Sequence, residues 1–347
     1  MINLYALTLD ELAELLAELG EPRFRARQIW DWMYAKRVGN FEAMTNLPRH
    51  TRRKLGEATR LGELEMAARR QSKDGTEKRL YRLPDGQLIE SVLMPYDNNR
   101  QTACISSQAG CAFGCVFCAT GQMGFGRHLS AAEIFEQAMI FARDLAARGE
   151  RLSNVVFMGM GEPFHNYDAS LAAVDKLMNR LGIGARHITI STVGLVPQIR
   201  RFADEGLQVK LAVSLHKADD SERSALLPVN RRWPIAELMD ACRYYVERTK
   251  RRITFEWAAI AGENDTVAEA RRLGRLLAGL HCHVNIIPLN PTGGYARGPA
   301  TALELERFLA TLRQYDVNAT VRVRRGIDIE AGCGQLKTAV MEAHKPG

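Results

Sequence analysis

From about residue 100 onward, apolar runs of strand length alternate with segments of helix length. The runs that we predict to be strands span residues 102–106, 154–158, 187–191, 209–214, 253–258, 283–288 and 319–323. The clearest helix signal is a capping box, in which Ser130 and Glu133 satisfy free amides of the first turn, and it predicts a helix to about residue 148. This alternation indicates an α/β fold whose parallel sheet is closed as a barrel or open and doubly wound.

Two units with different sequence patterns precede this region. Thr8 and Glu11 form another capping box ahead of leucines at helical spacing, so residues 1–60 are predicted to form a small helical domain that binds RNA. Residues 61–98 alternate apolar and polar side chains around Asp-Gly turn signals, which predicts a short linking β-meander. Residues 99–347 then form the barrel and a C-terminal segment.

Composition places the chain among ordinary folded proteins, with 46% hydrophobic and 25% charged residues. No apolar run is long enough to span a membrane, and acidic residues interrupt the apolar pattern of the first helix, unlike a secretory signal. We therefore expect a cytoplasmic protein without a membrane partner. The seven cysteines are an odd number, which favours metal or redox chemistry over a disulfide framework.

The net charge of +7 comes from local basic stretches. Residues 49–82 contain eleven basic and five acidic residues, and further basic clusters lie at 248–252 and 322–325. A basic surface can attract a polyanion such as RNA, but a solvated face of mixed charge is the simpler explanation of charge alone.

Three cysteines, Cys111, Cys115 and Cys118, lie in one glycine-rich loop after the first predicted strand of the barrel. Three convergent thiolates suit three irons of a [4Fe-4S] cluster, and the fourth iron would then be open to another ligand. A redox dithiol would leave Cys111 unexplained. A structural zinc site would need a fourth ligand, for which His128 is the only nearby candidate.

Unusual polar groups follow several other predicted strands. They are Gly161 and Glu162 after the second strand, Ser191 at the end of the third, Ser214, Leu215 and His216 at the end of the fourth, and Asn290 after the sixth. Each has an ordinary explanation, since serines satisfy backbone groups at strand ends and a lone histidine is usually a core residue. In barrels of βα units, however, catalytic groups gather at the carboxyl ends of the strands.

The cysteine loop resembles that of the radical S-adenosylmethionine (SAM) superfamily. Over nearly the whole chain the sequence is similar to the RlmN/Cfr family of rRNA methyltransferases, and Pro163 after Gly-Glu is more like the RlmN members. The likeness is carried by the segments 104–111, 157–163, 214–216 and 333–336. It implies a partial (βα)6-type, TIM-like radical SAM barrel. Lys217 departs from the family pattern, in which Ala is usual at this position.

The resemblance implies which residues bind the cofactors. Cys111, Cys115 and Cys118 are expected to hold one [4Fe-4S] cluster, and two SAM molecules are expected per turnover. The expected SAM contacts are Gly161, Glu162, Ser191, Ser214, Leu215, His216 and Asn290. The expected reaction is methylation of C2 of adenosine 2503 in 23S rRNA and, as in some members, of adenosine 37 in tRNA.

The resemblance also implies a methyl carrier. Cys333 is expected to take a methyl group from one SAM, Glu90 to remove the C2 proton of adenine, and Cys104 to release the product by forming a disulfide with Cys333. A monomer that receives electrons from a flavodoxin or ferredoxin is expected. Methylation of C8, as in Cfr, and a non-catalytic RNA-binding protein with a metal cluster remain the alternatives.

Overall fold

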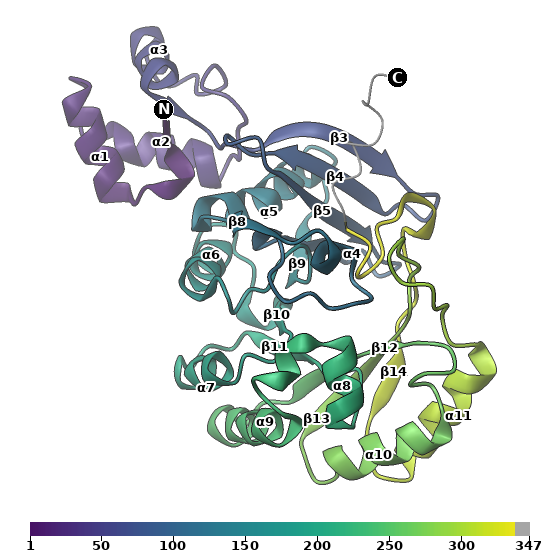
Figure 1. Cartoon of the computed structure of the whole chain (residues 1–347). Coiled ribbons are helices and arrows are strands. Elements are labelled where there is room, and N and C mark those ends of the chain that lie inside the picture. Colours follow the sequence, from purple (N-terminus) through teal and green to yellow (C-terminus); the bar gives the residue numbers. More distant parts are fainter. Residues whose placement is uncertain (337–347) are drawn as a thin grey trace.

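A ten-stranded sheet organises residues 1–336, which are the residues that the computed structural model describes (Figure 1). Residues 337–347 of the predicted third region lie outside them. The strand order is β14-β13-β12-β11-β10-β9-β6-β5-β4-β3. The sheet curves, and the helices that connect its parallel strands lie on its outer side (Figure 1). This arrangement confirms the predicted α/β fold with an incompletely closed barrel.

The parallel part of the sheet contains all seven strands that were predicted from the apolar runs. Their bounds are β6 Gln101–Cys104, β9 Leu152–Phe157, β10 Ile188–Thr192, β11 Lys210–Ser214, β12 Ile253–Ala259, β13 Cys282–Pro288 and β14 Ala319–Val321. Leu211, Ala212 and Val213 of β11 are fully buried, as expected for a strand covered on both faces. The polar residues after these strands therefore meet at one edge of the sheet.

Helices follow most of these strands. Their bounds are α4 Ala119–Gln122, α5 Ala131–Ala146, α6 Tyr167–Asn179, α7 Val196–Asp204, α8 Asp220–Leu226, α9 Ile235–Thr249, α10 Val267–Leu277 and α11 Ala302–Arg313. The capping box predicted at Ser130 and Glu133 is present at the start of α5. No described helix is long and apolar enough to cross a membrane.

The β-meander is not a separate sheet but an extension of the barrel sheet. Its strands, β3 Glu65–Gln71, β4 Glu77–Arg82 and β5 Leu88–Pro95, run antiparallel, and β5 pairs with β6. The two Asp-Gly turns form as predicted, with Gly75 and Gly86 at positive φ. The meander thus reaches directly into the region where the site forms.

The first 60 residues form a helical unit at one end of the molecule (Figure 1). It contains α1 Leu9–Glu18, α2 Arg25–Tyr34 and α3 Arg49–Ala58, and its ends are joined by the short parallel pair β1 Ile2–Asn3 and β2 Thr59–Arg60. Thr8 and Glu11 form the predicted capping box. Tyr5 packs edge-on against Phe135 of α5, which attaches the unit to the barrel.

The sequence did not predict a small hairpin that closes the cysteine loop. Its strands are β7 Gln108–Gly110 and β8 Phe125–His128. Cys111 N–H donates to the Gly124 carbonyl at 2.8 Å, and a Cβ on Gly110 would lie 2.1 Å from that same oxygen. Glycine is therefore required at position 110 for the loop to close. These strands are too short for an alternating pattern to reveal them.

Candidate active site

The carboxyl ends of the parallel strands surround a pocket. Of the residues singled out from the sequence, those that line it are Cys111, Cys115, Cys118, Gly161, Glu162, Ser191, Ser214, His216, Asn290 and Cys333. Leu215 lies fully buried in the core instead. The structure thus brings together motifs that are spread over more than 200 residues of sequence. We call this space the cofactor pocket.

The three cysteines of the loop line the cofactor pocket. Burial raises the pKa of all three thiols, and the neighbouring thiols add to the effect at Cys115. Among the described residues no three acidic, cysteine or histidine side chains converge closely enough to hold a single metal ion. Cluster ligands, by contrast, each bind a different iron, and three cysteines on the wall of one pocket fit that donor set.

His128 does not complete a zinc site with these cysteines. Its Nδ1 and that of His165 both accept hydrogen bonds from the Gln108 amide, at 3.0 and 3.1 Å. The oxygen of the same amide accepts the Glu162 N–H at 2.8 Å. Gln108, which the sequence analysis missed, therefore links the hairpin to the loop after β9.

Glu162 presents a buried carboxylate to the cofactor pocket. Its oxygens accept the N–H groups of Phe164 at 2.9 Å and Val193 at 2.7 Å, which fix its orientation. Burial nevertheless raises its pKa to about 7. Since each carboxylate oxygen can accept a further hydrogen bond, Glu162 can still bind an ammonium group, and such a cation would favour the charged form.

The ends of β10 and β11 are held by a buried arginine that the sequence did not indicate. Arg223 is fully buried and donates to the carbonyls of Val193, Ser214 and Leu215 at 2.9–3.1 Å. Burial lowers its pKa to about 10. These bonds fix the backbone that presents Ser214, while Leu215 contributes through the core rather than through the pocket wall.

His216 has positive φ, and its ring is held from two sides. Nδ1 accepts the Ala258 N–H at 2.9 Å, and the ring meets Phe117 of the cysteine loop edge-on with centroids 5.0 Å apart. Burial lowers its pKa to about 3, so the imidazole is neutral near pH 7. This histidine can therefore pack against an aromatic ligand and orient one, but it does not carry charge.

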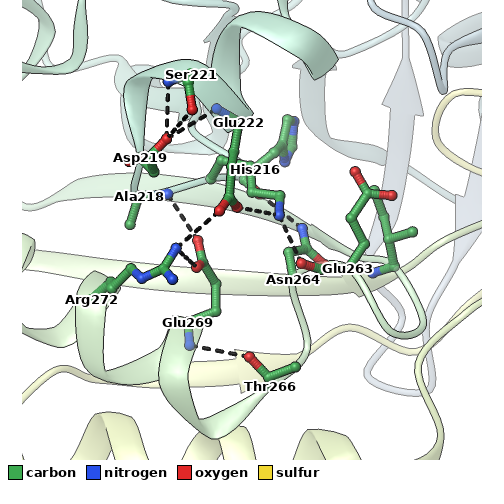
Figure 2. Close-up of polar contacts among 12 residues, drawn as sticks. His216, Ala218, Asp219, Ser221, Glu222, Glu263, Asn264, Thr266, Glu269 and Arg272 are labelled. Carbon is green, nitrogen blue, oxygen red and sulfur yellow. Dashed lines mark hydrogen bonds and ion pairs between the residues drawn. The ribbon is translucent and has the colours of Figure 1, made fainter.

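A polar network surrounds the residues that follow His216 (Figure 2). The Lys217 ammonium is buried and bonds Glu222 at 2.6 Å and the Glu263 carbonyl at 2.7 Å. Asn264 donates to the His216 carbonyl at 2.8 Å. The lysine, which stands where Ala is usual in the family, thus joins helix α8 to the loop after β12.

Cys333 and Asn290 line both the cofactor pocket and a second, adjoining pocket, which we call the inner pocket. The Asn290 amide donates to the Cys333 carbonyl at 3.1 Å, while its own oxygen is buried without a hydrogen-bond partner. A Cβ on Gly332 would lie 2.5 Å from the same amide. Asn290 therefore holds the cysteine segment in place and keeps one acceptor available for a ligand.

The inner pocket contains Cys104, and a cation lies beside Cys333. Burial, and next the nearby Cys333, raises the pKa of the Cys104 thiol to about 12. Arg322 Nη1 lies 3.9 Å from the Cys333 sulfur. The position of this arginine suits it to stabilise a negative charge that develops on Cys333. No sequence pattern had indicated that the two residues meet.

Glu90 lies on β5, on the same face as Val92, which lines the inner pocket, but Glu90 itself is not part of that lining. Its carboxylate pairs with the buried ammonium of Lys78 at 3.2 Å. Lys78 also donates to the Glu330 carbonyl at 3.1 Å. This lysine, which the sequence analysis missed, couples the predicted base to the segment that carries Cys333.

All seven cysteines are free thiols in the structure. The disulfide expected from the resemblance, between Cys104 and Cys333, is therefore not present in this state. Cys242 and Cys282 are buried outside both pockets, in agreement with their prediction as core residues.

The basic stretch of the N-terminal unit is largely neutralised by carboxylates. Arg52 pairs with Glu42, and Lys54 pairs with the buried Glu21 at 3.1 Å. Arg53 pairs with Glu57 on the same helix. These contacts favour a solvated face of mixed charge for α3, the simpler of the two explanations of its charge.

Comparison with known proteins agrees with this geometry. Residues 2–61 match the ribosomal RNA large subunit methyltransferase N-terminal domain, and residues 105–274 match the radical SAM superfamily. The chain is 54% identical to the dual-specificity RNA methyltransferase RlmN 1 of Myxococcus xanthus, over 97% of this chain and 95% of that protein. It is 45% identical to a probable RlmN of Geobacillus thermodenitrificans, over 96% and 92% of the two chains.

A solved structure has the same fold throughout. The crystal structure of a radical SAM methyltransferase from Sphaerobacter thermophilus matches with a TM-score of 0.93 and 50% identity, over 97% of this chain and 99% of that one. These matches favour an enzyme over the alternative of a non-catalytic RNA-binding protein. The chain belongs to the RlmN family of radical SAM methyltransferases, enzymes that methylate RNA by a radical mechanism.

Proposed function

We propose that this enzyme methylates C2 of adenosine 2503 in 23S rRNA and C2 of adenosine 37 in tRNA. The observation that carries the proposal is the position of Cys333, which lines both pockets. One of these pockets has the cluster cysteines in its wall, and the other has Cys104. A sulfur at this boundary can take a methyl group on one side and deliver it on the other.

The cofactor pocket is assigned one [4Fe-4S] cluster on Cys111, Cys115 and Cys118, together with SAM. When bound, these groups supply the 5′-deoxyadenosyl radical that removes a hydrogen atom from a methyl group. Glu162 would hold the amine of SAM, and the free oxygen of Asn290 would accept a hydrogen bond from it. Gly161, Ser191, Ser214, Leu215 and His216 would shape the remaining contacts.

The protein's own thiols perform the transfer. The Cys333 thiolate attacks the methyl carbon of one SAM and takes the methyl group, and S-adenosylhomocysteine is the leaving group. After hydrogen abstraction the carbon on Cys333 joins C2 of adenine. Glu90 takes the C2 proton, and the one surplus electron of the ring would pass to the oxidised cluster when it is bound. Cys104 then attacks the sulfur of Cys333. A disulfide forms, and the electron pair of the broken C–S bond, with a proton, completes the methyl group.

The reaction uses two SAM molecules per turnover, one as the methyl donor and one as the radical source. We propose a flavodoxin or ferredoxin as the electron donor, and a monomer in the cytoplasm as the working form. A base must leave its stack to reach Cys333, so the target adenosine is expected to be extruded into the inner pocket.

The test is mass spectrometry of nuclease-digested RNA after incubation with the reduced enzyme and SAM. A 2-methyladenosine product is expected, and 8-methyladenosine would assign the enzyme to the Cfr type of reaction instead. Cys104→Ala should accumulate a covalent protein–RNA adduct that survives denaturation, whereas the further change Cys333→Ala should abolish it. Cys282→Ala removes an equally buried thiol outside the pockets and should turn over normally. Normal turnover without an adduct in Cys104→Ala would refute the role of Cys104.

A further inference from the structure

An arginine–tyrosine cluster lies at the inner pocket. Tyr96 lines that pocket together with Arg325, and the guanidinium carbons of Arg100 and Arg325 lie 3.9 and 4.5 Å from the centre of its ring. The exposed Arg324 is adjacent in sequence and also lines the pocket. Two segments far apart in sequence thus place two positive charges over one aromatic ring and a third nearby, at the pocket that contains Cys104 and Cys333.

These charges lack the acidic partners that Arg52, Arg53 and Lys54 of α3 have. In the described part of the chain, none of Arg100, Arg324 and Arg325 forms an ion pair with a carboxylate. Moreover, Nε of Arg325 is buried without a hydrogen-bond acceptor. Like charges held close together without a counter-ion repel one another, and a buried donor without a partner is destabilising. An anion that accepts several hydrogen bonds would relieve both costs.

Position distinguishes this cluster from the other basic stretches. In the N-terminal unit Arg52, Arg53 and Lys54 of α3 are already paired, as described above. Residues 250–252 directly precede β12 and do not line the inner pocket, whereas Tyr96, Arg324 and Arg325 do. Arg100 precedes β6 and joins them through the ring of Tyr96. Unpaired positive charge thus lies at the pocket that contains Cys104 and Cys333.

We infer that Arg100 and Arg325, which stack on Tyr96, and the neighbouring Arg324 bind backbone phosphates of the RNA next to the target adenosine. The inference rests on the proposed function and adds to it the part of the substrate that this surface recognises. A guanidinium group matches the geometry of a phosphate with paired N–H donors, which makes arginine well suited to this contact. Contacts to phosphate position a strand without reading its sequence. The cluster would therefore hold the strand while the adenine base reaches Cys333.

The first test measures RNA binding by fluorescence anisotropy over a range of KCl concentrations, with the cluster-loaded full chain and a 23S rRNA fragment that contains the target. The variant is the double change Arg100→Gln with Arg325→Gln. Its matched control is Arg271→Gln with Arg313→Gln, which removes the same charge from exposed positions on α10 and α11. Each single-strand phosphate contact contributes about 0.7 to the salt slope, so the slope should fall by about 1.4, which is roughly 25-fold in affinity at 0.1 M salt. The control should change little.

The second test keeps the protein unchanged and neutralises the RNA. A methylphosphonate replaces the phosphate on either side of the target adenosine, one side at a time. At least one replacement should weaken binding to the wild-type enzyme, and the same replacement should cost the double variant almost nothing. An equal penalty in both proteins would overturn the inference. So would normal RNA binding combined with slower reduction by flavodoxin, because the arginines would then serve a protein partner.

The outcomes separate the inference from the function on which it rests. Methylation of unmodified RNA by the wild-type enzyme tests the proposed function alone. If that reaction occurs but the methylphosphonate lowers the RNA affinity of the wild type and of the double variant equally, only the inferred phosphate site is wrong. Iron content and SAM binding of the double variant should match those of the wild type, which excludes misfolding as the cause of weak RNA binding.

Discussion

Glu136 makes the stability of the chain depend on pH in a direction opposite to that of most carboxylates. It lies in α5 and is buried beneath the linker that follows the helical unit. Its two oxygens accept the N–H groups of Glu63 at 2.7 Å and Leu64 at 3.1 Å. Although these bonds favour the charged form, burial is the larger effect and raises its pKa to about 7 from an ordinary 4.5.

The sign of the effect follows from this raised pKa. Between pH 4.5 and 7 the folded protein binds the proton more tightly than the unfolded chain does, so stability falls as pH rises through this window. Below the window the contribution is fully present, and above it the contribution is lost. With these two values, raising the pH from 5 to 8 removes about 2.5 kcal/mol of stability.

The change Glu136→Gln should remove this dependence. Urea unfolding at pH values from 5 to 8 can be followed by the fluorescence of Trp30 and Trp32, which lie in α2. The difference in unfolding free energy, wild type minus Glu136→Gln, should fall by about 2.5 kcal/mol from pH 5 to pH 8. Glu162, whose pKa is also raised to about 7, is present in both proteins and cancels.

An exposed carboxylate on α11 provides the control. The difference in unfolding free energy between the wild type and Glu306→Gln should stay constant over the whole pH range. If the difference between the wild type and Glu136→Gln also stayed constant, Glu136 would not have the raised pKa that its burial implies, and the reasoning would be refuted.

Three further outcomes test the site. Cys115→Ala should abolish cluster binding, measured as iron per chain and by visible absorption after anaerobic reconstitution; a full cluster in this variant would exclude Cys115 as a ligand. Gly161→Ala should weaken SAM binding at least tenfold by calorimetry, because the residue has φ +95° and its new Cβ would lie 2.4 Å from that of Gln108. Lys217→Met should lower stability by about 2 kcal/mol in urea, because Glu222 and the Glu263 carbonyl lose a charged hydrogen-bond donor.

The parallel strands and the cysteine loop could be predicted because their signals are local. An apolar run such as residues 209–214, flanked by segments of helix length, is typical of a buried strand. The spacing of the three thiols in the loop 111–118 by itself indicates a metal or cluster site. For the same reason the polar residues at strand ends could be assigned to one site, since parallel strands end on one edge of a sheet.

The remaining features depend on partners that are distant in sequence. Glu90 has the pattern of an ordinary strand residue, and only the fold brings Lys78 from the neighbouring strand to it. Lys217 could be noted as a departure, but its partner at Glu263 lies 46 residues away. The fact that Arg325 and Arg100 share one tyrosine ring likewise follows from closure of the barrel and not from any local pattern.

The segment that carries Cys333 is tied to the meander at several points. Asp74 in the turn between β3 and β4 accepts the Gly326 N–H at 2.9 Å across 252 residues of sequence, and Asp328 accepts the Ser72 hydroxyl. A fragment that began at residue 99 would retain the parallel strands and the cluster loop, yet it would lose these anchors. Exchange of gene segments between relatives would therefore have to move residues 65–95 and 322–336 together, because these contacts form only when both partners match.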